Sequence, residues 1–92
     1  MAKNKLLFFY GDECPHCHEM EPHIEKLEKE EGVKFQKLEV WHNSKNAKKF
    51  AELDQGECGA VPYFYNKETE EGLCGEVSYK KLKKWALKGK KE

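Results

Sequence analysis

The sequence contains no arginine: all 17 of its basic residues are lysines, and 17 acidic residues balance them. Arginine supplies the planar, bidentate contacts with which proteins recognise phosphates, base edges and carboxylates. Its absence argues against recognition of these groups as a main function. We therefore expect no nucleic-acid partner.

Long apolar segments are also missing. The apolar run nearest the N-terminus is Leu6–Tyr10, whereas a membrane-spanning helix needs about 20 apolar residues. The run is also too short for the apolar part of a signal peptide, and no small-residue cleavage site follows it. We expect no membrane partner, and a soluble, cytoplasmic protein that acts as a monomer.

The size of the chain permits one domain with its own core. A chain of 92 residues buries enough surface to fold without disulfides or metal ions. We expect residues 1–92 to form a single domain with a disordered tail from about Gly89, and we expect no cofactor. Four cysteines are therefore free for chemistry: Cys14, Cys17, Cys58 and Cys74.

Apolar periodicity and turn residues predict an α/β chain with the element order βαβαββα. Strands are predicted at Lys5–Tyr10, Val33–Val40, Tyr63–Tyr65 and Leu73–Cys74. Helices are predicted from Pro15 to Gly32, from an N-cap at Ser44 through Leu53, and after an N-cap at Ser78.

One face of the first predicted helix is apolar. Its residues recur at spacings of three, four and three and are Cys17, Met20, Ile24 and Leu27. This stripe makes Cys17 the inward thiol and leaves Cys14 as the exposed one at the helix start. Pro22 falls inside the pattern, so we expect a kink there.

The segment Cys14-Pro15-His16-Cys17 joins the first predicted strand to this helix. Two thiols three positions apart at a helix start lie within bonding reach of each other. The free N–H groups and the positive end of the helix dipole favour a thiolate there and lower the thiol pKa. This pattern predicts thiol-disulfide exchange.

With Val61-Pro62 placed before a predicted strand, the chain resembles a small thioredoxin-fold protein of the thioredoxin and glutaredoxin group, from Lys5 to about Lys88. The resemblance implies a mixed four-stranded sheet flanked by helices and a protein-disulfide oxidoreductase. It implies that Cys14 is the attacking thiol and Cys17 the resolving thiol. The expected partners are protein disulfide or dithiol substrates and an upstream reductase or oxidase.

The resemblance also implies a substrate groove. Val61-Pro62 matches the family's loop with a cis proline beside the active site, which would present the backbone of Val61 to an extended substrate. Gly75 matches a glycine that lines this groove, and Tyr10 stands at a position where thioredoxins have tryptophan. Phe8 is a departure from the family, because it occupies the position of a buried acid under the resolving cysteine.

Residues around Cys14 are expected to tune its thiol. Pro15 and His16 form the dipeptide between the cysteines, and His16 can stabilise the Cys14 thiolate and make the protein more oxidising. Asp12 and Glu13 oppose the thiolate by their negative charge. A Pro-His dipeptide is typical of the periplasmic thiol oxidases of the superfamily, whereas the missing signal peptide argues against that branch.

The sequence leaves three interpretations of Cys58 and Cys74 open. Both should lie in the wall around the active site, one before Pro62 and the other at the end of the last predicted strand. They could form a second disulfide, a second redox pair, or two unpaired apolar side chains.

Other classes of function also fit part of the motif. Cys14-Pro15-His16-Cys17-His18 satisfies the C-x-x-C-H pattern of c-type haem attachment, with His18 as the axial ligand. Cys14, Cys17 and His18 could instead bind zinc together with Cys58 or Cys74. A thioredoxin-like interaction module without turnover is a third alternative. A Soret band would indicate haem, and measured zinc would indicate a metal site.

Overall fold

Strand β1 (Leu6–Tyr10) lies inside the sheet, because its continuous apolar run supplies buried side chains to both faces. In the computed structural model, which describes residues 6–87, β1 pairs in parallel with β2 (Phe35–Glu39) and antiparallel with β3 (Tyr63–Asn66). Strand β4 (Glu71–Cys74) continues the sheet antiparallel to β3, so the strand order is β2-β1-β3-β4.

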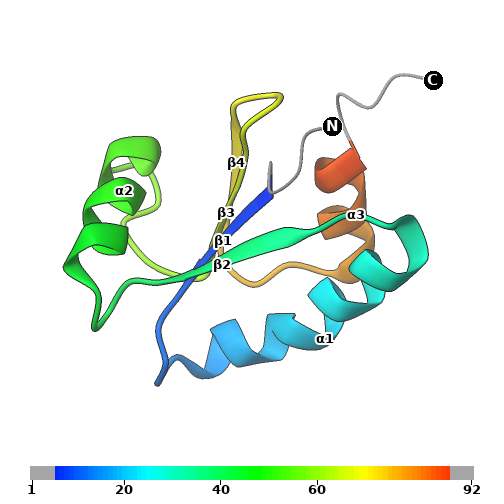
Figure 1. Ribbon diagram of the computed structural model, residues 1–92, viewed down its shortest axis with the longest axis horizontal. Helices are drawn as coiled ribbons and strands as arrows, with labels where there is room; N and C mark the ends of the chain where they lie inside the picture. The colour runs from blue at the N-terminus through cyan, green and yellow to red at the C-terminus, as the bar shows by residue number, and fades with distance from the viewer. Residues whose placement is uncertain (1–5, 88–92) are drawn as a thin grey trace.

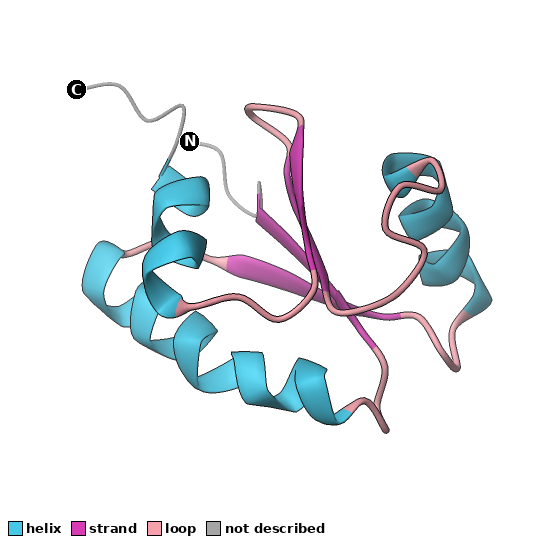
Figure 2. Ribbon diagram, turned by 180° about the vertical axis from the view of Figure 1, so that it is seen from behind, coloured by secondary structure: helices cyan, strands magenta, loops and turns pink. Residues whose placement is uncertain are grey.

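Helices cover both faces of this sheet. Helices α1 (Pro15–Glu31) and α3 (Tyr79–Leu87) lie on one face and α2 (Ser44–Asp54) lies on the other (Figures 1 and 2). Each face of the sheet has its own hydrophobic core, and alternate residues of β1 point into one or the other. Phe8 packs with residues of α1 and α3, and Phe9 packs with Phe50 of α2. The predicted α/β class, the βαβαββα order and the mixed four-stranded sheet flanked by helices are confirmed.

Most helix ends follow the sequence signals. Helix α1 begins at Pro15 and ends at Glu31. Gly32 is its C-cap, with a φ of 71°, and donates its N–H to the Glu28 carbonyl. Ser78 precedes α3, and its Oγ accepts the N–H of Lys81 at 3.2 Å. Pro22 lies inside α1, which continues through it to Glu31.

The predicted N-cap of α2 is wrong by one residue. Asn43, not Ser44, caps this helix: its Oδ1 accepts the N–H of Asn46 at 3.1 Å, and Ser44 is the first helical residue. Both residue types are good N-caps, so the two positions are hard to tell apart from sequence. The second strand is also shorter than the predicted Val33–Val40, since it begins at Phe35 and ends at Glu39.

Two further expectations concern the C-terminal tail and membrane-spanning helices. The tail predicted from about Gly89 lies outside the described residues. Among residues 6–87, no helix has both the length and the apolar character needed to cross a membrane.

Candidate active site

Cys14 and Cys17 are joined by a disulfide at the start of α1, with their Cα atoms 5.2 Å apart. Cys14 is the N-cap residue, Pro15 is the first residue of the helix, and the N–H of Cys17 donates to the Cys14 sulfur at 3.2 Å. A sulfur that already receives an N–H bond at the positive end of a helix is stabilised as a thiolate when the disulfide is reduced. The local structure therefore favours Cys14 as the reactive thiol.

The predicted exposure of Cys14 is wrong. Cys17 is fully buried, as predicted, but Cys14 is also buried and keeps only 4% of its surface exposed. The reason is tertiary: the Cys14 sulfur lies 4.0 Å from the carbonyl oxygen of Val61, which belongs to a loop far away in the sequence. The apolar periodicity of α1 alone could not predict that Val61 covers Cys14.

The Val61–Pro62 peptide bond is cis, and this loop is connected to the end of β4. The N–H of Gly75 donates to the Pro62 carbonyl at 2.8 Å, and Gly75 has a φ of 85°, a left-handed conformation that glycine adopts without strain. The structure thus brings Val61, Pro62 and Gly75 together beside Cys14.

Tyr10 lies at the end of β1 and is half-buried. Its ring stacks on Phe8 with 5.5 Å between the centroids. Burial and then the charge of Asp12 raise the pKa of Tyr10, so its hydroxyl stays protonated at neutral pH. Phe8 is fully buried and also stacks on Phe64, with 5.1 Å between the centroids, so an aromatic side chain occupies the position at which thioredoxins bury an acid.

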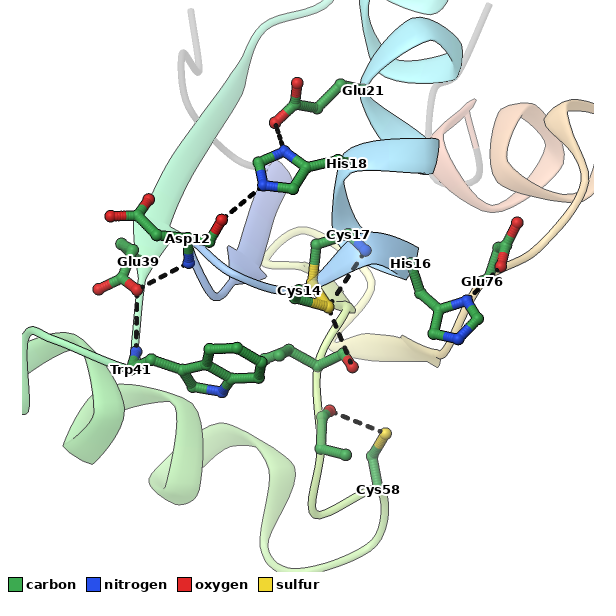
Figure 3. The surroundings of a disulfide bond; sticks show 12 residues. Asp12, Cys14, His16, Cys17, His18, Glu21, Glu39, Trp41, Cys58 and Glu76 are labelled. Carbon is green, nitrogen blue, oxygen red and sulfur yellow. Dashed lines mark hydrogen bonds and ion pairs between the residues drawn. A yellow bond between two sulfur atoms is a disulfide. The ribbon is translucent and has the colours of Figure 1, made fainter.

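His16 contacts an acidic side chain in the segment that follows β4. Its Nδ1 lies 2.8 Å from Oε1 of Glu76, a residue just beyond β4, and both side chains are exposed (Figure 3). The hydrogen bond from His16, and then that of Glu19, hold the pKa of the Glu76 carboxyl below its ordinary value. His16 thus links the start of α1 to the segment after β4.

Histidines offset the acidic residues that precede Cys14. Nε2 of His42 lies 2.8 and 2.9 Å from the carboxylate oxygens of Glu13, which raises the pKa of His42. His18 lies between the Asp12 carbonyl, 2.6 Å from its Nε2, and Glu21, 3.1 Å from its Nδ1. These contacts, that of Asp12 first, raise the pKa of His18. Protonated histidines reduce the repulsion that the acids exert on a Cys14 thiolate.

The contacts of His18 also bear on the haem and zinc alternatives. Both of its ring nitrogens have partners within the protein, the Asp12 carbonyl and Glu21. The described cysteines are bonded in two pairs, Cys14 with Cys17 and Cys58 with Cys74. In this arrangement His18 has no free nitrogen for an iron or zinc ion, and the cysteines are paired with each other.

Sequence reasoning missed the role of Glu39, the last residue of β2. Its Oε2 accepts the N–H groups of Asp12, at 3.0 Å, and Trp41, at 3.2 Å, and its Oε1 accepts that of His42 at 2.8 Å. Partial burial acts to raise the pKa of this carboxyl, but these hydrogen bonds outweigh it and lower the pKa. Glu39 therefore ties the loop before Cys14 to the loop after β2 (Figure 3).

Trp41 was also missed. It is the exposed large apolar residue of the described chain, with 51% of its surface accessible. Its indole packs on Gly11, where a Cβ atom would overlap the ring. The only signal in the sequence is the pair of a glycine before the motif and a tryptophan after the second strand, and nothing in their spacing predicts the contact.

The stability of the protein is expected to fall as the pH rises through neutrality, because of His18 and His42. Both have a folded-state pKa above the ordinary 6.5. Their contribution is fully present below pH 6.5 and is lost as the pH rises through the raised values. Both side chains are exposed, so the effect is small. Urea midpoints across this pH range should fall less steeply in His18→Ala/His42→Ala, and an unchanged slope would contradict the assignment.

Cys58 and Cys74 form the second disulfide of the chain. Their Cα atoms are 5.7 Å apart, inside the limit of about 7 Å for a bridge without backbone movement. The bridge links the loop before Pro62 to the last residue of β4. The bridge contradicts the interpretation of Cys58 and Cys74 as two unpaired side chains.

The fold and the helix-capping cysteine pair define a thioredoxin-fold protein with redox-capable cysteines. The thioredoxin family model matches residues 1–86, and the chain belongs to the thioredoxin family. A comparison with curated protein sequences gives no match.

Solved structures show the same fold. Thioredoxin f from spinach chloroplast, in its short form, aligns with a TM-score of 0.70 at 26% identity, covering 97% of this chain and 80% of that one. Fasciola hepatica thioredoxin aligns with a TM-score of 0.68 at 25% identity, covering 96% and 84%. The glutaredoxin grx-1 from Archaeoglobus fulgidus aligns with a TM-score of 0.62 at 20% identity, covering 88% and 84%.

Proposed function

We propose that the protein is a protein-disulfide oxidoreductase in which Cys14 attacks and Cys17 resolves. The observation that carries this proposal is the position of the Cys14 sulfur. It caps α1, receives the Cys17 N–H at 3.2 Å and lies against the Val61 carbonyl. It therefore combines a stabilised thiolate with a place beside a backbone that a substrate can reach.

The exchange consists of two displacements. In the reduced protein the Cys14 thiolate attacks one sulfur of a substrate disulfide, whose S–S bond breaks and releases a thiolate that takes up a proton. Cys17 then loses its proton and attacks the Cys14 sulfur of the mixed disulfide. The Cys14–Cys17 bond forms, the second substrate thiol is released, and the substrate has gained two electrons. The reverse sequence oxidises a substrate dithiol.

The loop before β3 supplies the substrate contact. Val61 is half-buried, Pro62 is buried, and the Pro62 carbonyl is already occupied by the Gly75 N–H. An extended substrate segment would pair with the backbone of Val61 and would place its cysteine next to Cys14. Gly75 leaves the approach open because it has no side chain.

His16 is proposed to tune the redox pair. The His16 imidazole near the helix start would stabilise the Cys14 thiolate by donating a hydrogen bond or by pairing with its charge, and Glu76 holds the ring in place. His16→Gly should raise the pKa of Cys14 and make the protein a better reductant, as measured by ultraviolet thiolate absorbance and by equilibration with a thiol redox buffer. Glu76→Gln is the matched variant, since it removes the ring's anionic partner but leaves the ring. Identical titrations of His16→Gly and the unmodified protein would mean that His16 has no such role.

The activity is tested by reduction of insulin with dithiothreitol as the electron source. Catalytic amounts of the protein should shorten the time to precipitation of the insulin B chain. If the protein is only an interaction module, it will bind partners but leave this time unchanged. Purified protein should show neither a Soret band nor stoichiometric zinc, in contrast to the haem and zinc alternatives.

The cellular setting is part of the same proposal. The partners would be protein disulfides or dithiols together with an upstream reductase or oxidase, and the protein would act as a cytoplasmic monomer. The acidic residues near the motif, Asp12 and Glu13, favour a partner with a basic contact surface.

A further inference from the structure

The second disulfide is more accessible than the first. Cys74 is exposed and Cys58 is half-buried, whereas Cys14 and Cys17 are both buried. Thiol-disulfide exchange requires in-line access of a thiolate to a sulfur, so exposure determines which reagents can react. A small thiol in solution therefore meets Cys58–Cys74 more readily than the pair in the motif.

The bridge also forms one wall of a cleft. This cleft of about 230 Å³ is lined by Asp54, Glu57, Cys58, Tyr63, Gly72 and Cys74. A second cleft of about 260 Å³ shares Asp54, Glu57, Tyr63 and Gly72 with the first and adds Glu70. The space beside the disulfide is thus large enough for a small molecule.

The clefts are acidic. Three carboxylates line them, from Asp54, Glu57 and Glu70, and none of the described lining residues is basic. Burial and then the charge of Asp54 raise the pKa of the lining Tyr63 to about 12, so this hydroxyl adds no negative charge at neutral pH. A cleft lined by one sign of charge concentrates the opposite sign and repels its own.

The bridge lies next to the proposed substrate loop. Asp54 is buried and accepts the N–H groups of Cys58 and Gly59, each at 2.7 Å. On the other side of the loop, Gly75 follows Cys74 directly and donates to the Pro62 carbonyl. The disulfide and these hydrogen bonds therefore hold the same segment of the chain.

We propose that Cys58–Cys74 is a second thiol-exchange site, which accepts small neutral or cationic thiols and excludes anionic ones. The thiolate of the small molecule attacks the sulfur of Cys74, the more exposed residue of the pair, the Cys58–Cys74 bond breaks, and Cys58 leaves as a thiolate that takes up a proton. A second molecule of the thiol attacks the mixed disulfide and releases Cys74, and the small molecule departs as its own disulfide. Two electrons pass to the protein. The new Cys58 thiol can donate to the Ala60 carbonyl, which lies 3.2 Å from its sulfur.

The test compares three thiols of similar size: cysteamine, 2-mercaptoethanol and 2-mercaptoethanesulfonate. The oxidised protein is exposed to each, quenched by alkylation and mapped by mass spectrometry, so that each pair is followed separately. Rates are expressed per thiolate and divided by the rate of the same thiol with a small neutral disulfide. For Cys58–Cys74 the cationic thiol should exceed the anionic one by about tenfold or more, and added salt should reduce this ratio.

Matched variants assign the effect to the cleft. Glu57→Gln and Glu70→Gln should each reduce the ratio, whereas Glu52→Gln, on the exposed side of α2 and outside the clefts, should leave it unchanged. Equal normalised rates for the three thiols would overturn the proposal, as would a Cys58–Cys74 bond that 2-mercaptoethanol reduces only after unfolding. Cys14→Ser/Cys17→Ser repeats the measurement without the first pair. Since no protein substrate is present, the result stands apart from that of the insulin assay.

Discussion

Cys14→Ser is expected to lower the rate of insulin reduction by about a thousandfold or more, because a serine hydroxyl is not ionised at neutral pH and cannot form the mixed disulfide. Cys14 is the cysteine that combines the helix N-terminus, the Cys17 N–H and contact with the Val61 loop. Cys17 does not take over the attack, since it is fully buried and does not occupy the N-cap position. The rate is measured with the dithiothreitol-driven turbidity assay.

The control for this variant is Cys58→Ser/Cys74→Ser, which leaves the motif intact. It should keep most of the activity if the second disulfide is not the site of protein reduction. Circular dichroism and urea midpoints establish that both variants are folded under the assay conditions. A Cys14→Ser protein that is folded and retains a tenth or more of the activity would contradict the assigned role.

The largest expected effect on stability comes from the second disulfide. The bridge joins residues 16 positions apart, and a closed loop of about that length is worth about 3 kcal/mol in the chain-entropy model. For a domain of this size, that corresponds to a melting temperature lower by about 12–24 °C. Cys58→Ser/Cys74→Ser should show this loss in thermal and urea denaturation under oxidising conditions.

Reduction provides the internal comparison for this prediction. With dithiothreitol present, the unmodified protein and the double variant should have similar stability, because neither contains the bridge. A difference below about 1 kcal/mol between the two oxidised proteins would mean that the bridge does not restrict the unfolded chain as the model assumes.

The sequence predicts the scaffold well because its signals there are local. The apolar run of β1, the stripe on α1 and Gly32 at its end each follow from the spacing of neighbouring residues. The same holds for the C-x-x-C segment at the helix start. These features need no knowledge of distant contacts, which is why the βαβαββα order could be stated in advance.

The remainder of the site depends on contacts between distant segments. Cys14 is buried because Val61 covers it, and its exposure was therefore predicted wrongly. Glu39 and Trp41 reach the loop before Cys14 only once β2 has paired with β1, so no local pattern marks them. The N-cap error at α2 has a different cause, since two adjacent residues can both cap the helix.

The most direct test of the dithiol mechanism is to trap the mixed disulfide. The reduced Cys17→Ser protein is mixed with a disulfide-containing protein, quenched by alkylation, and digested for peptide mapping. The account predicts a stable covalent complex linked through Cys14, because the resolving thiol is missing, and no such complex with Cys14→Ser. Complexes of equal yield from both variants, or a linkage through Cys58 or Cys74, would contradict it.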